Sequence, residues 1–508
     1  MSENTVSEKV NHKKEELLLL AGILCLGVAL RIFGLVSRGI WYDDAFSILL
    51  SKQSLPAIFS GTAADTMPPL YYLLLHFWMK VSQSIAWMRL LNLFLFLLLQ
   101  WTVYQWVKEL STKRAAYIVV FFTATAPFLI YHTHEIRMYM LLALCQTAYF
   151  FFFTRWFSAV QSGQNNFSNA ILMLVCGSAA LYTHNLAVFG LIIPGIYLLM
   201  RRHWKLFFQW GLFLLGSMLL FLPWLVYVPG QIEKIQTAFW TPRPGLLEII
   251  QSVYSLLSIL PQSNPWTLIS GVLIFQFLVL LFLEAYRQRF QIKFLGLLML
   301  GIGILPLLLF IISYLMRPVY VARGFILSLV LIYILAAILC TIHWRSGFAK
   351  IIIGMLVIIS GISLAFYYPV NSFPRSPFKD ACAYLNQQAD HDPNRLILHD
   401  NKLSYFPCVV YQPQLNQAFI GDEPGTHNDT LAYASQEAMH IFPVKSLETA
   451  VKDKQEVYFV VFTRALAEYE DMALGEYPAL VTLSSQYTLQ SIINFNDLAV
   501  YHYVKQAP

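Results

Sequence analysis

The sequence predicts a polytopic α-helical membrane protein with a small α/β domain at its C-terminus. Of its 508 residues, 57% are hydrophobic and only 12% are charged, about half the charged share of a typical soluble domain. The mean hydropathy is +0.57. A soluble chain of this size cannot bury so much apolar surface, so the soluble, disordered and fibrous classes are excluded. Aromatic residues make up 15% of the chain, and many stand beside basic residues, as they do at membrane interfaces.

The distribution of charge divides the chain into two parts. Residues 1–370 carry 25 Lys and Arg against 12 Asp and Glu, a net charge of +13, whereas residues 371–508 carry 9 against 16, a net charge of −7. We therefore expect a basic membrane body over 1–370 and an acidic soluble domain over 371–508. Short basic loops account for the positive charge, so it does not indicate a nucleic-acid partner.

Apolar runs of membrane-spanning length predict about 11 transmembrane helices. The first run, 15–36, is too long and too poorly followed by small residues to be a cleaved signal peptide. A shorter run, 68–82, opens with Pro68-Pro69 and is expected to lie at the interface or to re-enter rather than cross. The other predicted spans are 85–107, 115–132, 137–158, 169–184, 186–200, 206–228, 266–286, 293–314, 322–343 and 349–369.

Basic residues near the spans predict the orientation. Lys9, Lys13 and Lys14 precede the first span and place the N-terminus in the cytoplasm by the positive-inside rule. If 68–82 does not cross, four further basic clusters fall on the same side and the C-terminal domain lies outside. We therefore expect an integral membrane protein with a cytoplasmic N-terminus and an extracytoplasmic C-terminal domain. The clusters are Lys108, Lys113 and Arg114; Arg201, Arg202 and Lys205; Arg287, Arg289 and Lys293; and Arg345 with Lys350.

The C-terminal part alternates helix-like and strand-like segments, which predicts a small α/β domain. The six Cys residues are spread singly, without CxxC or metal-ligand spacing. Only Cys382 and Cys408 lie in this domain, where a disulfide is possible. The helix-like segments are 378–388 and 446–454, and the strand-like segments are 395–400, 408–412, 457–463 and 497–504.

With this topology, acidic residues gather in the first outer loop. Asp43 and Asp44 are adjacent there, and Asp65 stands near its end. Acids at a membrane boundary are costly unless they are hydrated or paired. One interpretation is helix capping, with an interfacial helix starting near Ala45. The other is a general base in a cavity at the membrane surface.

A second polar loop, 131–139, joins two predicted spans. Glu135 and Tyr139 are one helical turn apart in it, and Glu135 also suits a helix N-terminus. His132 and His134 form a His-x-His pair. No clear third ligand accompanies them, so a divalent metal is possible but not supported by the sequence. We expect no cofactor.

Further polar residues fall on the same outer side. His184 interrupts an apolar hairpin at its outer turn, for which an ordinary polar turn is the simpler interpretation. Arg317 and Arg323 lie in the last outer loop of the membrane body, where they could clamp a phosphate or anchor in lipid headgroups. Arg31, near the outer end of the first span, either snorkels or faces the same cavity.

Together these motifs resemble the GT-C superfamily of membrane glycosyltransferases, and within it the bacterial branch related to protein O-mannosyltransferases and the lipid A aminoarabinose transferase. The resemblance covers roughly residues 15–370. It also extends, in outline, to the periplasmic α/β domain of such proteins. Besides the acid pair, it rests on D-x-x-P-P-L-Y-Y from Asp65, E-x-R-M-Y from Glu135, Tyr-Thr-His ending at His184 and P-x-Y-x-x-R ending at Arg323.

The resemblance implies a hexosyl- or pentosyltransferase that uses a polyprenyl-phosphate sugar donor and a glycan, lipid or protein acceptor on the outer side. It also implies that the protein lies in the bacterial plasma (inner) membrane. It makes Asp43 the catalytic base and Asp44 the second acid, where the family usually has Glu. Met67 replaces a His that the family often has before the two prolines. The implied donor- and acceptor-binding residues are Asp65, Glu135, Arg137, Tyr139, His184, Arg317 and Arg323.

This chemistry suits the residues that the sequence offers. A sugar phosphoester already carries an activated leaving group, so the reaction needs a carboxylate to deprotonate the acceptor and cations to hold the phosphate. The chain has no GxxxxGK[ST] or GxGxxG loop, as expected for an enzyme that binds no nucleotide.

Three other functions are compatible with parts of the sequence. A transporter or lipid flippase would place its ionisable groups near the bilayer midplane, whereas here they gather at one face. A sugar polymerase or ligase with a related membrane body remains an alternative. A noncatalytic scaffold is disfavoured by the adjacent acids.

Overall fold

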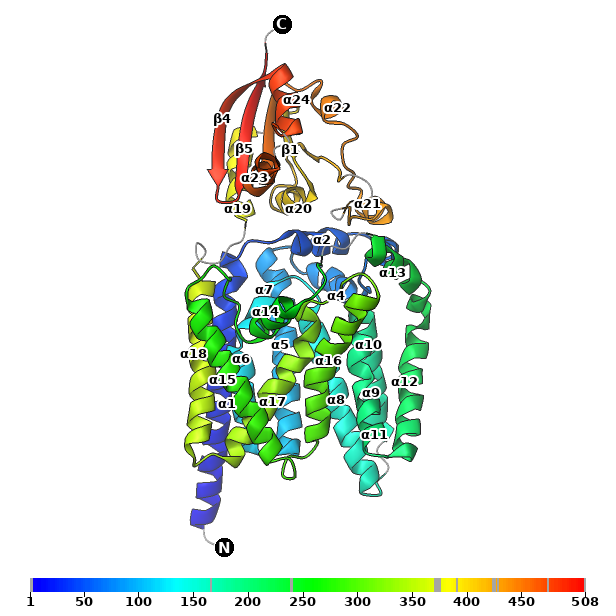
Figure 1. Cartoon of the computed structure of the whole chain (residues 1–508), viewed down its shortest axis with the longest axis vertical. Helices are drawn as coiled ribbons and strands as arrows, with labels where there is room; N and C mark the ends of the chain where they lie inside the picture. Colours follow the sequence, from blue (N-terminus) through cyan, green and yellow to red (C-terminus); the bar gives the residue numbers. More distant parts are fainter. Residues whose placement is uncertain are drawn as a thin grey trace.

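A helical membrane body and a C-terminal domain follow one another along the long axis of the molecule, and the two chain ends lie at opposite ends of it (Figure 1). The computed structural model describes residues 3–164, 167–237, 241–369, 376–389, 392–422, 426, 429–472 and 475–506. The domain boundary expected between 370 and 371 lies outside the described residues.

Long apolar helices form the membrane body, so the chain is an integral membrane protein. In the described part of the chain, eight helices are long and apolar enough to cross a membrane. The predicted helical membrane fold is therefore confirmed. The eight are α1 (Glu3–Ser37), α5 (Ile85–Leu110), α8 (Tyr139–Gln161), α12 (Trp204–Leu225), α15 (Trp266–Arg287), α16 (Leu295–Leu315), α17 (Ile326–Ile342) with the preceding 3-10 turn η1 (Ala322–Phe325), and α18 (Gly347–Tyr367).

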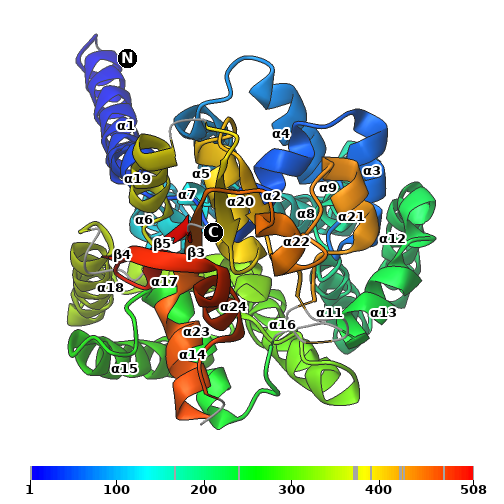
Figure 2. The ribbon, with the colours of Figure 1, turned by 90° about the horizontal axis from the view of Figure 1, so that it is seen from above.

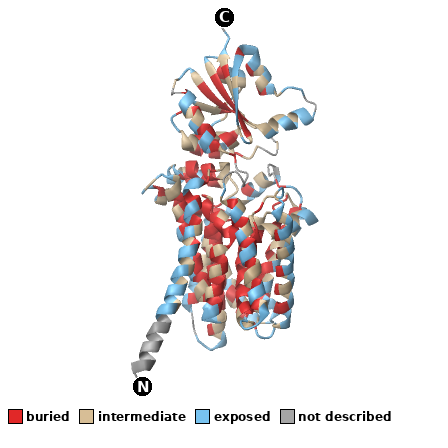
Figure 3. Ribbon diagram, turned by 90° about the vertical axis from the view of Figure 1, so that its left-hand side faces the viewer, coloured by how far each residue is buried: buried red, intermediate tan, exposed pale blue. Residues whose placement is uncertain are grey.

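These helices divide into a central and a peripheral set. The apolar window of α17 is 89% buried, as expected for a helix that is hydrophobic all round. The windows of α1, α12 and α15 are only 22% buried, so their apolar faces are available to lipid. Figure 3 shows the buried residues concentrated inside the bundle and in the sheet of the C-terminal domain.

Three of the eleven predicted spans are short or broken. Helices α6 (Lys113–Thr125) and α7 (Pro127–His134) meet at a bend of 54°, because Pro127 has no N–H to continue the α6 ladder. The other two are α9 (Phe167–Thr183) and the pair α10 (Ala187–Leu191) with α11 (Ile193–Met200). Every predicted span coincides with a helix or a helix pair, and eleven crossings require each of these three to cross.

Short helices cover the end of the bundle that faces the C-terminal domain (Figure 1). The run 68–82 forms α4, whose ten residues reach only about 15 Å, half the hydrocarbon thickness. It is therefore too short to cross, as predicted. The sequence pattern did not predict α13 or α14. The set comprises α2 (Tyr42–Ser51), α3 (Leu55–Ala64), α4 (Leu70–Met79), α13 (Val228–Thr237) and α14 (Leu246–Leu257).

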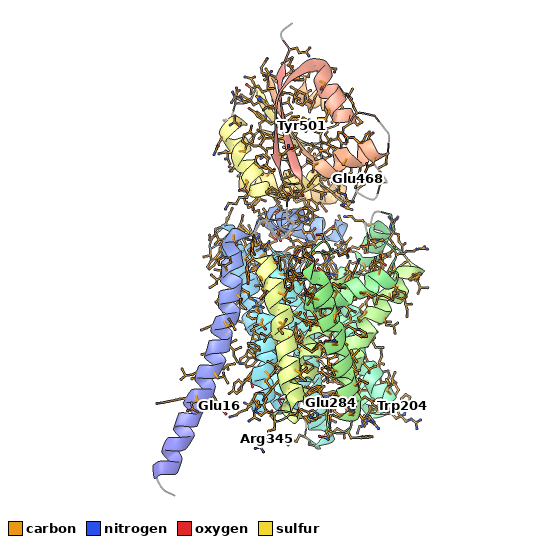
Figure 4. The ribbon with its side chains drawn as sticks, turned by 60° about the vertical axis from the view of Figure 1, so that its left-hand side comes forward. Glu16, Trp204, Glu284, Arg345, Glu468 and Tyr501 are labelled. Carbon is orange, nitrogen blue, oxygen red and sulfur yellow. The ribbon has the colours of Figure 1, made fainter. Side chains whose placement is uncertain are left out.

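The predicted basic clusters lie near the opposite end of the bundle. Figure 4 labels Glu16, Trp204, Glu284 and Arg345, all at the end remote from the C-terminal domain. At this end the Arg114 guanidinium also lies 4.9 Å from the centre of the Trp344 ring. The clusters therefore share one side of the membrane, the condition from which the orientation was predicted.

The C-terminal domain is built on a five-stranded sheet in the order β2-β1-β3-β5-β4. The pairs β1–β2 and β1–β3 are parallel, whereas β3–β5 and β4–β5 are antiparallel. The strands are β1 (Arg395–His399), β2 (Gln417–Phe419), β3 (Glu456–Phe462), β4 (Tyr487–Phe495) and β5 (Leu498–Lys505). The helices are α19 (Phe378–Ala389), α20 (Lys402–Tyr411), α21 (Tyr433–Met439), α22 (Leu447–Val451), α23 (Thr463–Asp471) and α24 (Pro478–Gln486).

The small α/β domain and its helices over 378–388 and 446–454 are confirmed, as are three of the four predicted strands. The strand predicted over 408–412 is wrong, because residues 408–411 belong to α20 and Gln412 caps its end. Asn401 starts that helix by accepting the backbone N–H of Leu403 at 2.9 Å, a cap that favours helix over strand. Strand β4 was missed because its mostly exposed residues lack a clear apolar alternation.

Two helices of the C-terminal domain rest on the membrane body (Figure 2). In α20, the Phe406 ring stacks on Phe46 at 6.5 Å and meets the edge of Tyr42 at 5.1 Å. In α21, Ser435 donates a hydrogen bond to the Gly61 carbonyl of α3 at 2.9 Å. A Cβ atom at Gly61 would lie 2.6 Å from a Leu50 methyl group and 3.1 Å from Ala438 Cβ in α21, so any larger residue would require Leu50 to move. The domain therefore packs directly on α2 and α3.

Candidate active site

The two adjacent acids of the first outer loop lie in different environments at the start of α2. Asp44 is 1% exposed, and its carboxylate accepts the backbone N–H of Trp41 at 3.0 Å and of Ile136 at 2.7 Å. The first bond closes the initial turn of α2, where an acid also favours the helix dipole. The Asp43 side chain is 37% exposed. The capping interpretation therefore fits Asp44, and Asp43 is the accessible acid.

Arg323 is the cation opposite Asp43. The turn η1 places its Nη1 atom 3.7 Å from Asp43 Oδ2, and its side chain is 28% exposed. The same guanidinium lies 5.6 Å from the centre of the Tyr139 ring. Because both charges keep part of their contact with solvent, the pair is weakly bound and can exchange partners with a ligand.

Arg137 holds α2 against α4 from the other side. Its Nη1 donates to Ser47 Oγ at 3.3 Å, to Tyr72 Oη at 3.3 Å and to the Asp43 carbonyl at 3.5 Å. The side chain is only 6% exposed. Arg137 therefore fixes the backbone that carries Asp43 and adds a second positive charge beside it.

Glu135 and His132 form a hydrogen-bonded pair next to Tyr139. His132 Nδ1 lies 2.7 Å from Glu135 Oε2, and since a carboxylate only accepts, Nδ1 carries the hydrogen. Asn92 in α5 donates to the Glu135 carbonyl and so fixes the loop. The His132 and Tyr139 rings lie 4.7 Å apart, which links the pair to the ring beneath Arg323.

His184 occupies the outer turn between α9 and α10, as predicted. Its Nδ1 accepts the backbone N–H of Leu186 at 3.1 Å, and its ring lies 6.4 Å from that of Tyr139. Burial, with Arg323 and Arg137 nearby, lowers the pKa of His184 to about 3. The imidazole is therefore neutral at physiological pH, so it adds a polar group but no charge.

Asp65 and Arg317 are held on the side of α13. Asp65 ends α3, and its Oδ1 lies 3.1 Å from Lys234 Nζ. Burial, followed by the charges of Asp65 and Asp43, raises the pKa of Tyr42 well above its ordinary value, so both acids act on that ring. Arg317 donates to the Gln236 carbonyl at 3.3 Å.

The His-x-His pair and Arg31 have structural partners. His134 bonds Tyr367 Oη and the Arg31 carbonyl, each at 2.7 Å, while His132 bonds Glu135. The described residues contain no group of three or more His, Cys, Asp or Glu that could hold a metal ion. Arg31 is fully buried and donates to the Ala124 carbonyl at 2.8 Å. It therefore neither snorkels nor faces the site. Instead it hydrogen-bonds backbone carbonyls at the end of α6, where the helix is interrupted.

The structure gathers six of the candidate residues around one point. They come from the start of α2, from the loop before α8 and the first residue of α8, from the turn after α9 and from the turn before α17. Sequence reasoning missed Tyr72 and Lys234 and considered His132 only as a metal ligand. Tyr72 lies within the quoted D-x-x-P-P-L-Y-Y segment, whereas Lys234 is a lone basic residue without a pattern. The six are Asp43, Glu135, Arg137, Tyr139, His184 and Arg323.

Comparison with solved structures identifies the fold. The chain superposes on ArnT from Cupriavidus metallidurans in the apo state with a TM-score of 0.61 and 12% identity, covering 95% of this chain and 97% of that one. For the same protein bound to undecaprenyl phosphate the TM-score is 0.60 with 14% identity and the same coverage. For the Archaeoglobus fulgidus oligosaccharyltransferase in the apo form it is 0.56 with 13% identity, covering 97% and 74%.

No protein-family model and no curated protein sequence matches the chain. At these identities the likeness to solved structures establishes the fold. The chain has the GT-C fold over nearly its whole length, membrane body and C-terminal domain included, which confirms the fold that the resemblance implies.

Proposed function

We propose that this protein is a membrane glycosyltransferase that moves a sugar from a polyprenyl-phosphate carrier to an acceptor. The observation that carries the proposal is the accessible Asp43 carboxylate beside Arg323. The shared fold supports it, because ArnT has been solved with undecaprenyl phosphate and the archaeal oligosaccharyltransferase AglB with a dolichol-phosphate. Both ligands are polyprenyl phosphates of the kind that such a donor would release.

The geometry suggests how Asp43 and the two arginines share the reaction. Asp43 takes the proton of the acceptor hydroxyl while the acceptor oxygen attacks the anomeric carbon of the sugar. The bond between that carbon and the phosphate oxygen breaks, and the polyprenyl phosphate leaves with the electron pair. Arg323 and Arg137 stabilise the negative charge that develops on the phosphate. A phosphate that attracts Arg323 also frees Asp43 to act as a base.

A transfer assay tests this function. Membranes containing the protein are incubated with undecaprenyl-phosphate-linked labelled hexoses and pentoses and with candidate glycan, lipid and protein acceptors. We expect a labelled product together with free undecaprenyl phosphate. Movement of the label across the vesicle membrane without a new glycosidic product would contradict the proposal and favour a transporter or lipid flippase. A lengthened glycan chain as product would favour the polymerase.

We also propose that the site and the C-terminal domain face the outside of the bacterial plasma membrane. The basic clusters lie at the opposite end of the bundle (Figure 4), which the positive-inside rule assigns to the cytoplasm. A reporter fused after Tyr368 is therefore expected to show extracytoplasmic activity. A second fusion in the loop after Trp344 serves as the inner control. Cytoplasmic activity of the Tyr368 fusion would reverse the orientation.

Arg323 is expected to contact the donor phosphate. Replacing it by Lys keeps the charge but loses the planar fork of donors that matches a phosphate, so affinity for undecaprenyl phosphate should fall by roughly tenfold. Binding to purified protein measures this change, and the melting temperature should stay the same because the pair with Asp43 is partly solvated. Unchanged affinity in Arg323→Ala would remove Arg323 from the donor site.

A further inference from the structure

Two buried polar atoms beside the Asp43–Arg323 ion pair have no hydrogen-bond partner among the described residues. Among the side chains that the structure describes, none hydrogen-bonds His132 Nε2 or the Tyr139 hydroxyl. The two residues are 4% and 1% exposed, and their rings lie 4.7 Å apart. A buried polar group without a partner destabilises the fold, so two of them side by side require an explanation.

The position of these atoms suggests a ligand. Tyr139 lies beneath the Arg323 guanidinium, which in turn lies 3.7 Å from Asp43. His132 is oriented by Glu135 through its other ring nitrogen. Both rings are thus fixed by neighbours and lie close to the proposed reaction point.

The bonding capacities of the two atoms define the chemistry of that ligand. Because His132 Nδ1 carries a hydrogen for Glu135, a neutral imidazole offers Nε2 as an acceptor. The Tyr139 hydroxyl offers a donor hydrogen. A group that both donates and accepts satisfies the two atoms together, and a sugar hydroxyl is such a group. A phosphate only accepts, so it would pair with Tyr139 and leave the Nε2 atom of a neutral His132 unsatisfied.

The geometry points to a sugar-binding subsite in which His132 Nε2 and the Tyr139 hydroxyl hold one hydroxyl group of the transferred sugar. This inference rests on the glycosyl transfer proposed above. It assigns to His132 a contact with the substrate, and it separates the sugar from the phosphate, which Arg323 holds. Substrate binding then satisfies the two atoms that the protein leaves unpaired.

Tyr139→Phe tests the subsite through two effects of opposite direction. The variant removes a hydroxyl that has no protein partner, so the melting temperature should stay the same or rise. The catalytic efficiency kcat/KM with the best donor among undecaprenyl-phosphate hexoses and pentoses should fall by roughly 5- to 100-fold. Affinity for undecaprenyl phosphate alone should not change, because the lost bond is to the sugar.

Tyr149→Phe is the matched control in the same helix. Tyr149 is also 1% exposed, but its hydroxyl has partners in the protein. It donates a hydrogen bond to the Leu191 carbonyl at 3.0 Å and accepts one from the Trp210 indole N–H at 2.9 Å. Its loss should lower the melting temperature by a few degrees and leave transfer by the folded protein unchanged. His132→Asn, which keeps an N–H for Glu135 and removes Nε2, should repeat the loss of transfer seen for Tyr139→Phe.

The outcomes separate the subsite from the function on which it rests. If the wild-type protein transfers sugar and Tyr139→Phe transfers it equally well, the subsite is wrong and the function stands. If affinity for undecaprenyl phosphate falls as much as kcat/KM, Tyr139 holds the phosphate and the subsite is also wrong. If the wild-type protein transfers no sugar, both proposals fall.

Discussion

Replacing Asp43 by Asn is expected to reduce sugar transfer on the order of 10²–10⁴-fold, the factor attributed to a positioned general base. Asn is nearly the same size as Asp, but its amide cannot take a proton from the acceptor hydroxyl. The fold should be unaffected, because the Asp43 carboxylate is 37% exposed and its pair with Arg323 is partly solvated, so the pair is worth only about 0–1 kcal/mol. Transfer assays and melting curves of purified protein measure both effects.

Glu109→Gln is the control for the loss of a charge from a partly exposed ion pair. Glu109 pairs with Arg155 at 2.7 Å, with side chains 40% and 43% exposed, at the other end of α5 and α8. This variant should transfer sugar normally. If a well-folded Asp43→Asn protein also transfers sugar at the wild-type rate, Asp43 is not the base and Asp65 becomes the next candidate.

The membrane body could be predicted from the sequence because the length of an apolar run is a local property. The runs 15–36 and 322–343 need no knowledge of neighbours to indicate helices α1 and α17. Segment 408–412 fails for the opposite reason. Its apolar residues suit a buried strand or a buried helix equally well, and the Asn401 cap, together with packing on α2, decides for the helix. Helix α14 was missed because it is too short and one-sided to be taken for a span.

The site was predictable in its members but not in their roles. Motif order placed Asp43, Asp44 and Arg323 on one face, yet nothing in two adjacent acids says which one is buried. That choice depends on the Ile136 backbone N–H, which lies 92 positions from Asp44 in the sequence and reaches it only in the folded protein. The partner of Asp65, Lys234, lies even farther away, 169 positions along the sequence, and is supplied by a helix that no pattern indicated.

Asp44→Asn is expected to destabilise the protein strongly, in contrast to Asp43→Asn. Both Asp44 oxygens accept backbone N–H groups, from Trp41 and Ile136, and the residue is 1% exposed. An Asn side chain has only one acceptor oxygen, so its NH₂ group must face one of the two N–H groups. Losing a charged hydrogen bond and leaving a buried N–H unpaired should cost about 2–5 kcal/mol. A lower melting temperature and a smaller folded fraction in detergent measure this cost.

The comparison of the two variants decides between a structural and a catalytic role for Asp44. The resemblance to the GT-C family implies a catalytic role, whereas burial and the two backbone bonds favour a structural one. If the structural role holds, transfer by Asp44→Asn should fall in proportion to the folded fraction, and a lower assay temperature should restore part of it. A variant that melts like the wild-type protein yet transfers no sugar would make Asp44 catalytic. In that case the Trp41 and Ile136 contacts would serve to orient a second acid beside Asp43.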